Sequence, residues 1–137
     1  MTDSHIITGG CHCGAVRFQI AGEARGVVNC HCGQCVKTHG HYAPYSNCTK
    51  ADLEVTDEEN ITWYHSSAEA RRGFCSKCGS QLFWEEEDSA NTSIAAGAFD
   101  VPSGLKTLGN IFVADKPDYY EITDGLPAFP RGDGGKL

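Results

Sequence analysis

Eight cysteines constrain the fold of this 137-residue chain most strongly, because seven of them gather in three short motifs. The motifs are CHC at residues 11–13, CHCGQC at residues 30–35 and CSKC at residues 75–78. The first ten residues, MTDSHIITGG, lack the basic and apolar leader of a secreted protein, and cytosolic thiols are kept reduced. We therefore expect a cytoplasmic protein whose cysteines bind metal rather than form disulfides.

The motif CSKCG at residues 75–79 has the spacing of a zinc knuckle. Two thiolates three positions apart in a tight turn can both reach one metal ion. Gly79 tolerates a positive φ, which brings backbone N–H groups toward the sulfurs, and we expect Gly14 and Gly33 to act in the same way. A closed structural zinc needs two further ligands. The spacing leaves two sources open, either the CHC motif or two cysteines of the CHCGQC motif.

The CHCGQC motif has three cysteines and therefore lacks one ligand of a tetrahedral zinc. If the CHC motif completes the knuckle, these three cysteines remain for a second metal ion. Three protein ligands and an open fourth position are the usual form of a catalytic zinc. The seven clustered cysteines would then divide into a closed set of four and an open set of three.

Nearby side chains could instead close this second site. His39 and His41 are near enough in the sequence to reach it, and Cys48 is a further candidate. A lone cysteine in a strand is more often a small buried residue, which is our expectation for Cys48. His31 alternates with two ligands in an extended segment and should point away from the metal. The remaining histidines are expected to be ordinary surface or hydrogen-bonded residues: His5, His12 and His65.

The rest of the sequence predicts a mainly β protein of short antiparallel strands. Val16, Phe18 and Ile20 alternate with polar residues, the period of a half-buried strand. Only residues 34–39 favour a helical turn. We expect one domain over residues 1–137, with an ordered core over about residues 5–130 and a flexible tail over residues 131–137. Further strands are predicted at residues 27–28, 53–55, 61–64, 82–84, 94–96, 111–113 and 119–122.

The charge balance points to a small-molecule partner. Eighteen acidic residues against eleven Lys and Arg give a formal net charge of -7, and no basic stripe is present to neutralise phosphates. No run approaches the roughly 20 apolar residues of a membrane helix. We therefore expect neither nucleic acid nor membrane as a partner. Arg71, Arg72 and Lys37 could hold a carboxylate near the site, but ordinary surface cations are the simpler interpretation.

Taken in order, the motifs resemble the glutathione-dependent formaldehyde-activating enzyme (GFA) family, which also contains the centromere protein V domain. The resemblance runs from about Gly9 to Pro130 and is carried by GGCHCGAVRF, VVNCHCGQC, RRGFCSKCGSQLF, IAAGAFD and IFVADKPDYYEITDGLP. It implies an Mss4-like β-tent pinned by zinc. It implies a structural zinc held by Cys11, Cys13, Cys75 and Cys78. It also implies a second, more labile zinc that faces the substrate and is held by Cys30, Cys32 and Cys35.

The resemblance also implies a carbon–sulfur lyase activity like that of S-(hydroxymethyl)glutathione synthase, which joins glutathione to formaldehyde. The cysteines of the CHCGQC motif would then be catalytic as ligands of the open zinc, where a thiol would lose its proton. The expected partner is a small thiol such as glutathione. The alternative is a non-enzymatic zinc-binding module that carries a thiol or docks a protein partner.

Overall fold

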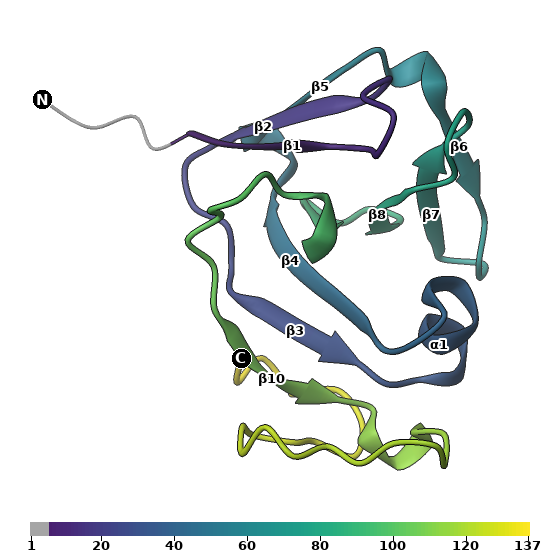
Figure 1. Ribbon diagram of the computed structural model, residues 1–137, viewed down its shortest axis with the longest axis vertical. Coiled ribbons are helices and arrows are strands. Elements are labelled where there is room, and N and C mark those ends of the chain that lie inside the picture. Colours follow the sequence, from purple (N-terminus) through teal and green to yellow (C-terminus); the bar gives the residue numbers. More distant parts are fainter. Residues whose placement is uncertain (1–5) are drawn as a thin grey trace, which may run out of the picture.

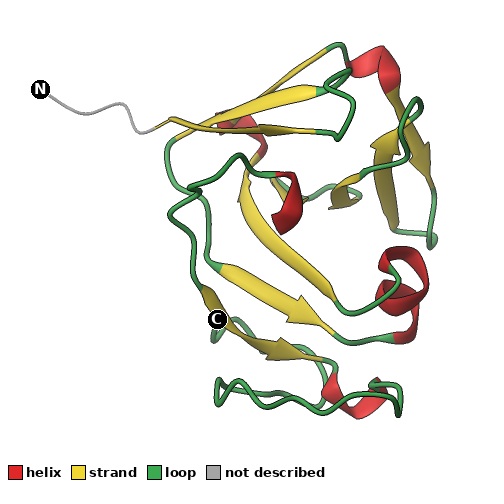
Figure 2. Cartoon of the chain, in the orientation of Figure 1, coloured by secondary structure: helices red, strands yellow, loops and turns green. Residues whose placement is uncertain are grey.

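The computed structural model describes residues 6–137, so His5 and the expected start of the core near residue 5 lie outside the described residues. Short strands dominate this part of the chain, which confirms the mainly β prediction (Figures 1 and 2). None of its helices is long and apolar enough to cross a membrane. The strands are β1 (Ile6–Gly10), β2 (Arg17–Ala21), β3 (Val27–Cys30), β4 (Ala43–Thr49), β5 (Leu53–Thr56), β6 (Ile61–Tyr64), β7 (Ala70–Cys75), β8 (Gln81–Glu86), β9 (Asn91–Ala95) and β10 (Thr107–Ile111). The helices are α1 (Gly33–His39) and the 3-10 helices Lys50–Asp52, Glu58–Asn60, Ala96–Ala98 and Val113–Asp115.

The strands form two sheets. The smaller has the order β1-β2-β5, and the larger has the order β10-β3-β4-β9-β8-β7-β6. Every strand pair is antiparallel, as predicted, except β10 with β3. A parallel pair needs a long crossover, and here the chain from β4 to β9 supplies it. The C-terminal part of the chain is thereby brought beside β3, which ends at Cys30 (Figure 1).

The main core lies between the two sheets. Phe18 on β2 meets Phe83 on β8 with ring centroids 5.7 Å apart, and meets Phe99 edge-on at 5.6 Å. Val16 and Ile20 are fully buried beside it while Arg17 and Gln19 are exposed, as the alternation predicts. Burying one such aromatic side chain stabilises the fold by about 1.5–3 kcal/mol. Cys48 is also buried in this core, as expected.

Two segments differ from the predicted strands. Residues 119–122 form a loop, because Tyr119 and Tyr120 both pack on the ring of His41 instead of alternating between core and solvent. The strand predicted at 111–113 ends at Ile111, and Phe112 takes a left-handed φ of 57° before a 3-10 helix. Strands β1 and β7 were not predicted from the sequence.

Residues 131–137, predicted to be a flexible tail, lie beside β10 (Figure 1). The Phe112 N–H donates to the Arg131 carbonyl at 2.9 Å. The Asp133 carboxylate accepts from the Leu137 N–H at 2.9 Å and from the Gly135 N–H at 3.0 Å. The first bond ties the segment to the residue after β10 and the other two close a turn within it, and its flexibility stays a prediction.

Candidate metal centres

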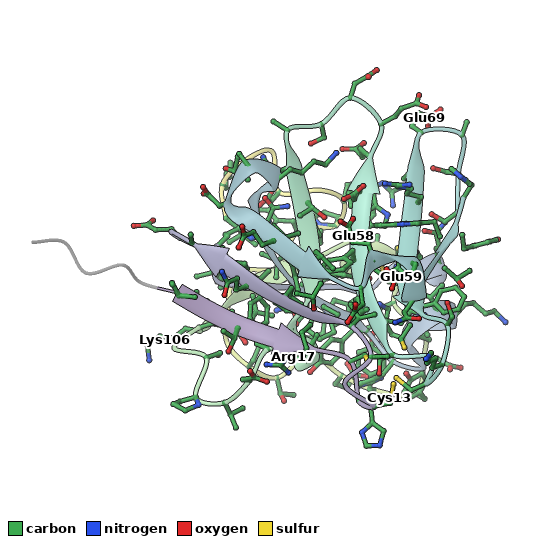
Figure 3. The ribbon with its side chains drawn as sticks, turned by 90° about the horizontal axis from the view of Figure 1, so that it is seen from above. Cys13, Arg17, Glu58, Glu59, Glu69 and Lys106 are labelled. Carbon is green, nitrogen blue, oxygen red and sulfur yellow. The ribbon has the colours of Figure 1, made fainter. Side chains whose placement is uncertain are left out.

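The first cluster, here called the four-cysteine site, joins the end of β1 to the turn after β7. Its members are Cys11, Cys13, Cys75 and Cys78, whose sulfurs all lie within 4.8 Å of one another. Cys13 Sγ is 3.7 Å from Cys11 Sγ and 3.8 Å from Cys75 Sγ, far beyond the roughly 2.05 Å of a disulfide bond. Figure 3 shows sulfur atoms gathered beside Cys13. The four free thiols can hold one metal ion.

Backbone N–H groups point at the sulfurs of this site. Cys75 Sγ accepts from the Lys77 and Cys78 N–H groups at 3.3 and 3.4 Å, while Cys11 Sγ accepts from Val16 at 3.3 Å. Gly79 closes the knuckle with a φ of 80°, as predicted. The contact with the Ser80 hydroxyl at 3.2 Å lowers the pKa of Cys78 to about 5. Each of these donors favours the thiolate form that a metal ion requires.

The CHC motif itself is not extended. Residues 12 and 13 lie in a turn, closed by the Gly14 N–H donating to the Cys11 carbonyl at 3.2 Å. Gly14 has the expected positive φ of 83°. Gly33 does not have the expected positive φ, because this residue is the first of helix α1. The two C-x-C pairs therefore present their sulfurs through different backbone geometries, a turn in one and a strand end leading to a helix in the other.

The second cluster, here called the three-cysteine site, consists of Cys30, Cys32 and Cys35, whose sulfurs also lie within 4.8 Å of one another. Cys30 ends β3, Cys32 is the N-cap of α1, and Cys35 lies in the first turn of that helix. Cys32 Sγ accepts from the Cys35 N–H at 3.4 Å. Hydrogen bonds with Cys30 and Cys35 lower the pKa of Cys32 to about 2. Hydrogen bonds with Cys32 and Cys35 raise the pKa of Cys30 far above its usual range. The cluster thus favours a thiolate and can hold a metal ion.

The candidate fourth ligands do not join these three sulfurs. Within residues 6–137, no histidine, carboxylate or further cysteine belongs to the cluster. His39 Nε2 lies 2.8 Å from the Tyr45 hydroxyl, and His41 Nδ1 lies 2.5 Å from the Tyr119 hydroxyl. A metal ion held by this cluster would therefore have three protein ligands from residues 6–137.

His31 points away from the cluster, as predicted, but it has an anchoring role that the sequence analysis missed. It is 1% exposed, with Nε2 2.9 Å from Asn110 Oδ1 and Nδ1 2.6 Å from the Tyr120 hydroxyl. Asn110 Nδ2 donates to both Asp124 carboxylate oxygens at 3.1 and 3.3 Å, which turns its Oδ1 toward His31. The His31 Nε2–H therefore donates, and in the neutral ring Nδ1 accepts from Tyr120. The C-terminal segment thereby fixes the middle of the C-x-C pair.

The expectation of a surface position is wrong for Arg72, which is 3% exposed. Its Nε and Nη2 donate to Gln34 Oε1 at 3.1 and 2.7 Å, its Nη1 to the Tyr45 hydroxyl at 3.2 Å, and its Nη2 to Cys35 Sγ at 3.6 Å. Arg71 faces the other side of β7, 3.7 Å above the Trp63 ring. Successive strand residues face opposite sides, so one arginine is at the site and the other at the surface. Lys37, His12 and His65 are exposed, as expected.

A pocket of about 420 Å³ opens beside the three-cysteine site. Trp84 and Tyr45 contribute aromatic walls, and Arg25 contributes a cation. Arg25 donates through Nε to the Gly26 carbonyl at 3.1 Å and through Nη2 to the Tyr45 carbonyl at 2.9 Å. Its Nη1 makes no hydrogen bond within residues 6–137, while the Asp133 carboxylate lines the same pocket and acts on Arg25 through space. Sequence spacing gave no sign of this pocket, because its lining residues come from α1 and from β3, β4, β7, β8, β9 and β10.

The sequence profile of the glutathione-dependent formaldehyde-activating enzyme family matches residues 6–115. The chain belongs to this family. An uncharacterized lyase of Schizosaccharomyces pombe is 28% identical over 123 residues, covering 88% of this chain and 88% of that protein. A putative glutathione-dependent formaldehyde-activating enzyme of Halomonas elongata is 30% identical over 130 residues, covering 85% of this chain and 81% of that protein.

A solved structure shares the fold of this GFA-family chain. The crystal structure of a Rhodobacter sphaeroides protein aligns with a TM-score of 0.57 and 24% identity over 73% of this chain and 97% of its own. The family and its relatives support a lyase-type enzyme at the level of the family. The donor sets fit a soft, borderline metal such as zinc, because every candidate ligand is a thiol and several already accept N–H bonds.

Proposed function

We propose that this GFA-family chain is a zinc-dependent carbon–sulfur lyase acting on a small thiol, such as glutathione, and its aldehyde adduct, such as S-hydroxymethylglutathione. The observation that carries the proposal is the three-cysteine site, which has no fourth protein ligand within residues 6–137 and borders a pocket of about 420 Å³. An open position next to a cavity is the usual form of a catalytic zinc, whereas structural zinc has four protein ligands.

In this proposal the four-cysteine site holds a structural zinc and the three-cysteine site holds the second, labile zinc. The first set joins β1 to β7 and has its sulfurs capped by backbone N–H groups. The second set comes from one short segment, so its ligands restrain the chain less. A bound zinc supplies positive charge at an open coordination position, which lowers the pKa of an entering thiol from a usual value of about 8.5.

The chain's own residues bind and orient the reactants. Trp84 and Tyr45 line the pocket and exclude water from one side of the thiol. The Arg25 Nη1, which makes no hydrogen bond within residues 6–137, can donate to a carboxylate of the thiol, an interaction strengthened by charge. The substrate sulfur then adds to the aldehyde carbon, a carbon–sulfur bond forms, and the proton released by the thiol ends on the former carbonyl oxygen. The reverse reaction breaks that bond and releases thiol and aldehyde.

The test is a calorimetric titration of the zinc-loaded protein with glutathione, combined with NMR measurement of adduct formation from formaldehyde. Cys32→Ser, which removes one ligand of the three-cysteine site, is the control. We expect binding and faster adduct formation that both disappear in Cys32→Ser. Absence of binding at millimolar glutathione would exclude the proposed activity on glutathione. Binding without faster reaction would favour the alternative, a zinc-binding module that carries a thiol.

A further inference from the structure

Arg72 carries a buried positive charge for which residues 6–137 supply no carboxylate partner. The ion pairs in this part of the chain use other cations, namely Arg17, Lys50, Arg71 and Arg131. A buried charge is strongly unfavourable unless an opposite charge and hydrogen bonds compensate it. Arg72 has the hydrogen bonds, but Gln34 and Tyr45 are neutral acceptors at neutral pH. Its remaining contact is Cys35 Sγ at 3.6 Å, a thiol that would become anionic as a metal ligand.

The same guanidinium fixes the segment between two ligands. Gln34 stands between Cys32 and Cys35, and its Oε1 accepts two N–H groups of Arg72 at 3.1 and 2.7 Å. Tyr45 on β4 accepts a third at 3.2 Å. Arg72 thus ties the N-terminal turn of α1 to β7 and β4, across elements that are distant in the sequence. A planar guanidinium is suited to reach these two oxygen acceptors and a sulfur at once.

We propose that Arg72 is the counter-ion and positioning residue of the three-cysteine site. Three thiolates exceed the charge of one divalent ion by one unit, and the guanidinium balances that unit. The inference rests on the proposed function for the presence of a metal at this site. Within residues 6–137 no arginine or lysine side chain hydrogen-bonds to the four-cysteine site, whose sulfurs contact backbone N–H groups, each other and the Ser80 hydroxyl. Arg17, which acts on Cys11 through space, is paired with Asp100. The two sites therefore differ in their need for Arg72.

The experiment measures the affinity of both sites in one protein, with Zn²⁺ and with Co²⁺, by competition with a chelator in the absence of added thiol. We expect Arg72→Met to weaken the three-cysteine site by about 10- to 100-fold, the usual effect of losing a partner of a metal ligand. The four-cysteine site should keep its affinity and serve as an internal control. Arg72→Lys keeps the charge but not the planar guanidinium, and should weaken the metal affinity of the three-cysteine site by about 3- to 10-fold. Arg71→Met, on the opposite face of β7, should leave both sites unchanged.

Co²⁺ adds a readout that a merely structural role would not change. The thiolate-to-cobalt absorption band of the three-cysteine site should shift in Arg72→Met, because the N–H donor on Cys35 Sγ is lost, while the band of the four-cysteine site stays in place. Second-site affinity within twofold of the unmodified protein would overturn the proposal, as would equal weakening of both sites. If Arg72→Met does not fold, Arg72→Lys decides by the same criteria.

Added glutathione separates this inference from the proposed function. A protein that holds no second metal refutes both. If glutathione leaves the Co²⁺ spectrum unchanged while Arg72→Met still weakens the second site, only the proposed thiol chemistry fails. If glutathione changes the spectrum and Arg72→Met has no effect on metal affinity, only the role of Arg72 fails.

Discussion

Removing the knuckle should destabilise the fold far more than removing the second cluster. The four-cysteine site links Cys13 to Cys75, which are 62 positions apart in the chain. Treated as a cross-link, a loop of this length is worth about 4 kcal/mol of chain entropy. Unfolding entropy scales with chain length, so for 137 residues this loss corresponds to a Tm lower by about 15 °C.

The three-cysteine site closes a loop of only five positions, between Cys30 and Cys35. The loop-closure term for this site is about 2 kcal/mol smaller, equivalent to about 8 °C in Tm. We therefore expect the zinc-loaded Cys75→Ser/Cys78→Ser variant to melt at least about 8 °C below Cys32→Ser/Cys35→Ser. Circular dichroism at matched zinc concentration measures both transitions. Equal melting temperatures, or a lower one for the second variant, would refute the assignment of the structural role to the knuckle.

Three further predictions concern single residues. Burial, with added repulsion from Arg72, lowers the pKa of His39 to about 4. The unfolded chain then binds more protons between pH 4 and about 6.5, and stability falls as the pH drops through that window; an NMR titration midpoint near 6.5 would contradict this. Asn110→Leu should cost about 1–3 kcal/mol in urea unfolding, because it leaves the His31 Nε2–H buried without an acceptor; an unchanged midpoint argues against the anchor. Gly79→Ala should cost about 1–2 kcal/mol from its φ of 80° alone, since an added Cβ meets nothing within 4 Å; Gly33→Ala, where φ is not positive, is the matched control, and equal losses would exclude backbone strain as the cause.

Local sequence patterns correctly predicted those features that depend only on neighbouring residues. The alternation of Val16, Phe18 and Ile20 predicted a half-buried strand, and the knuckle spacing predicted the positive φ of Gly79. Spacing could not decide which cluster completes the knuckle, because that depends on how β1 and β7 meet in space. The resemblance to the GFA family supplied the grouping into four and three, and the structure brings the same sulfurs together.

The failures of prediction also have a physical origin. Residues 70–75 read ARRGFC, without the apolar alternation of a strand, so nothing in the sequence distinguished Arg72 from Arg71. Pairing in the sheet makes that distinction, since it turns adjacent side chains to opposite faces. Residues 119–122 read YYEI and contain residues that favour strands. The Tyr120 hydroxyl instead hydrogen-bonds to His31, and Lys116 Nζ lies 4.9 Å from the Tyr120 ring centroid. Tertiary contacts thus override a weak local preference.

The two sites differ in where their supporting contacts come from, and this difference bears on specificity. The sulfurs of the four-cysteine site are capped mostly by N–H groups of their own turns. The three-cysteine site takes its ligands from one short segment but its supports from distant ones, with Arg72 on β7 and Asn110 on β10. Its pocket walls, such as Trp84, come from further strands. Under the proposed function, substitutions in those walls should change which thiol binds without altering a metal ligand. We expect Arg25→Met to weaken the binding of carboxylate-bearing thiols relative to 2-mercaptoethanol, while the metal affinities of both sites stay constant. An equal loss of affinity for both kinds of thiol would show that Arg25 does not bind the carboxylate.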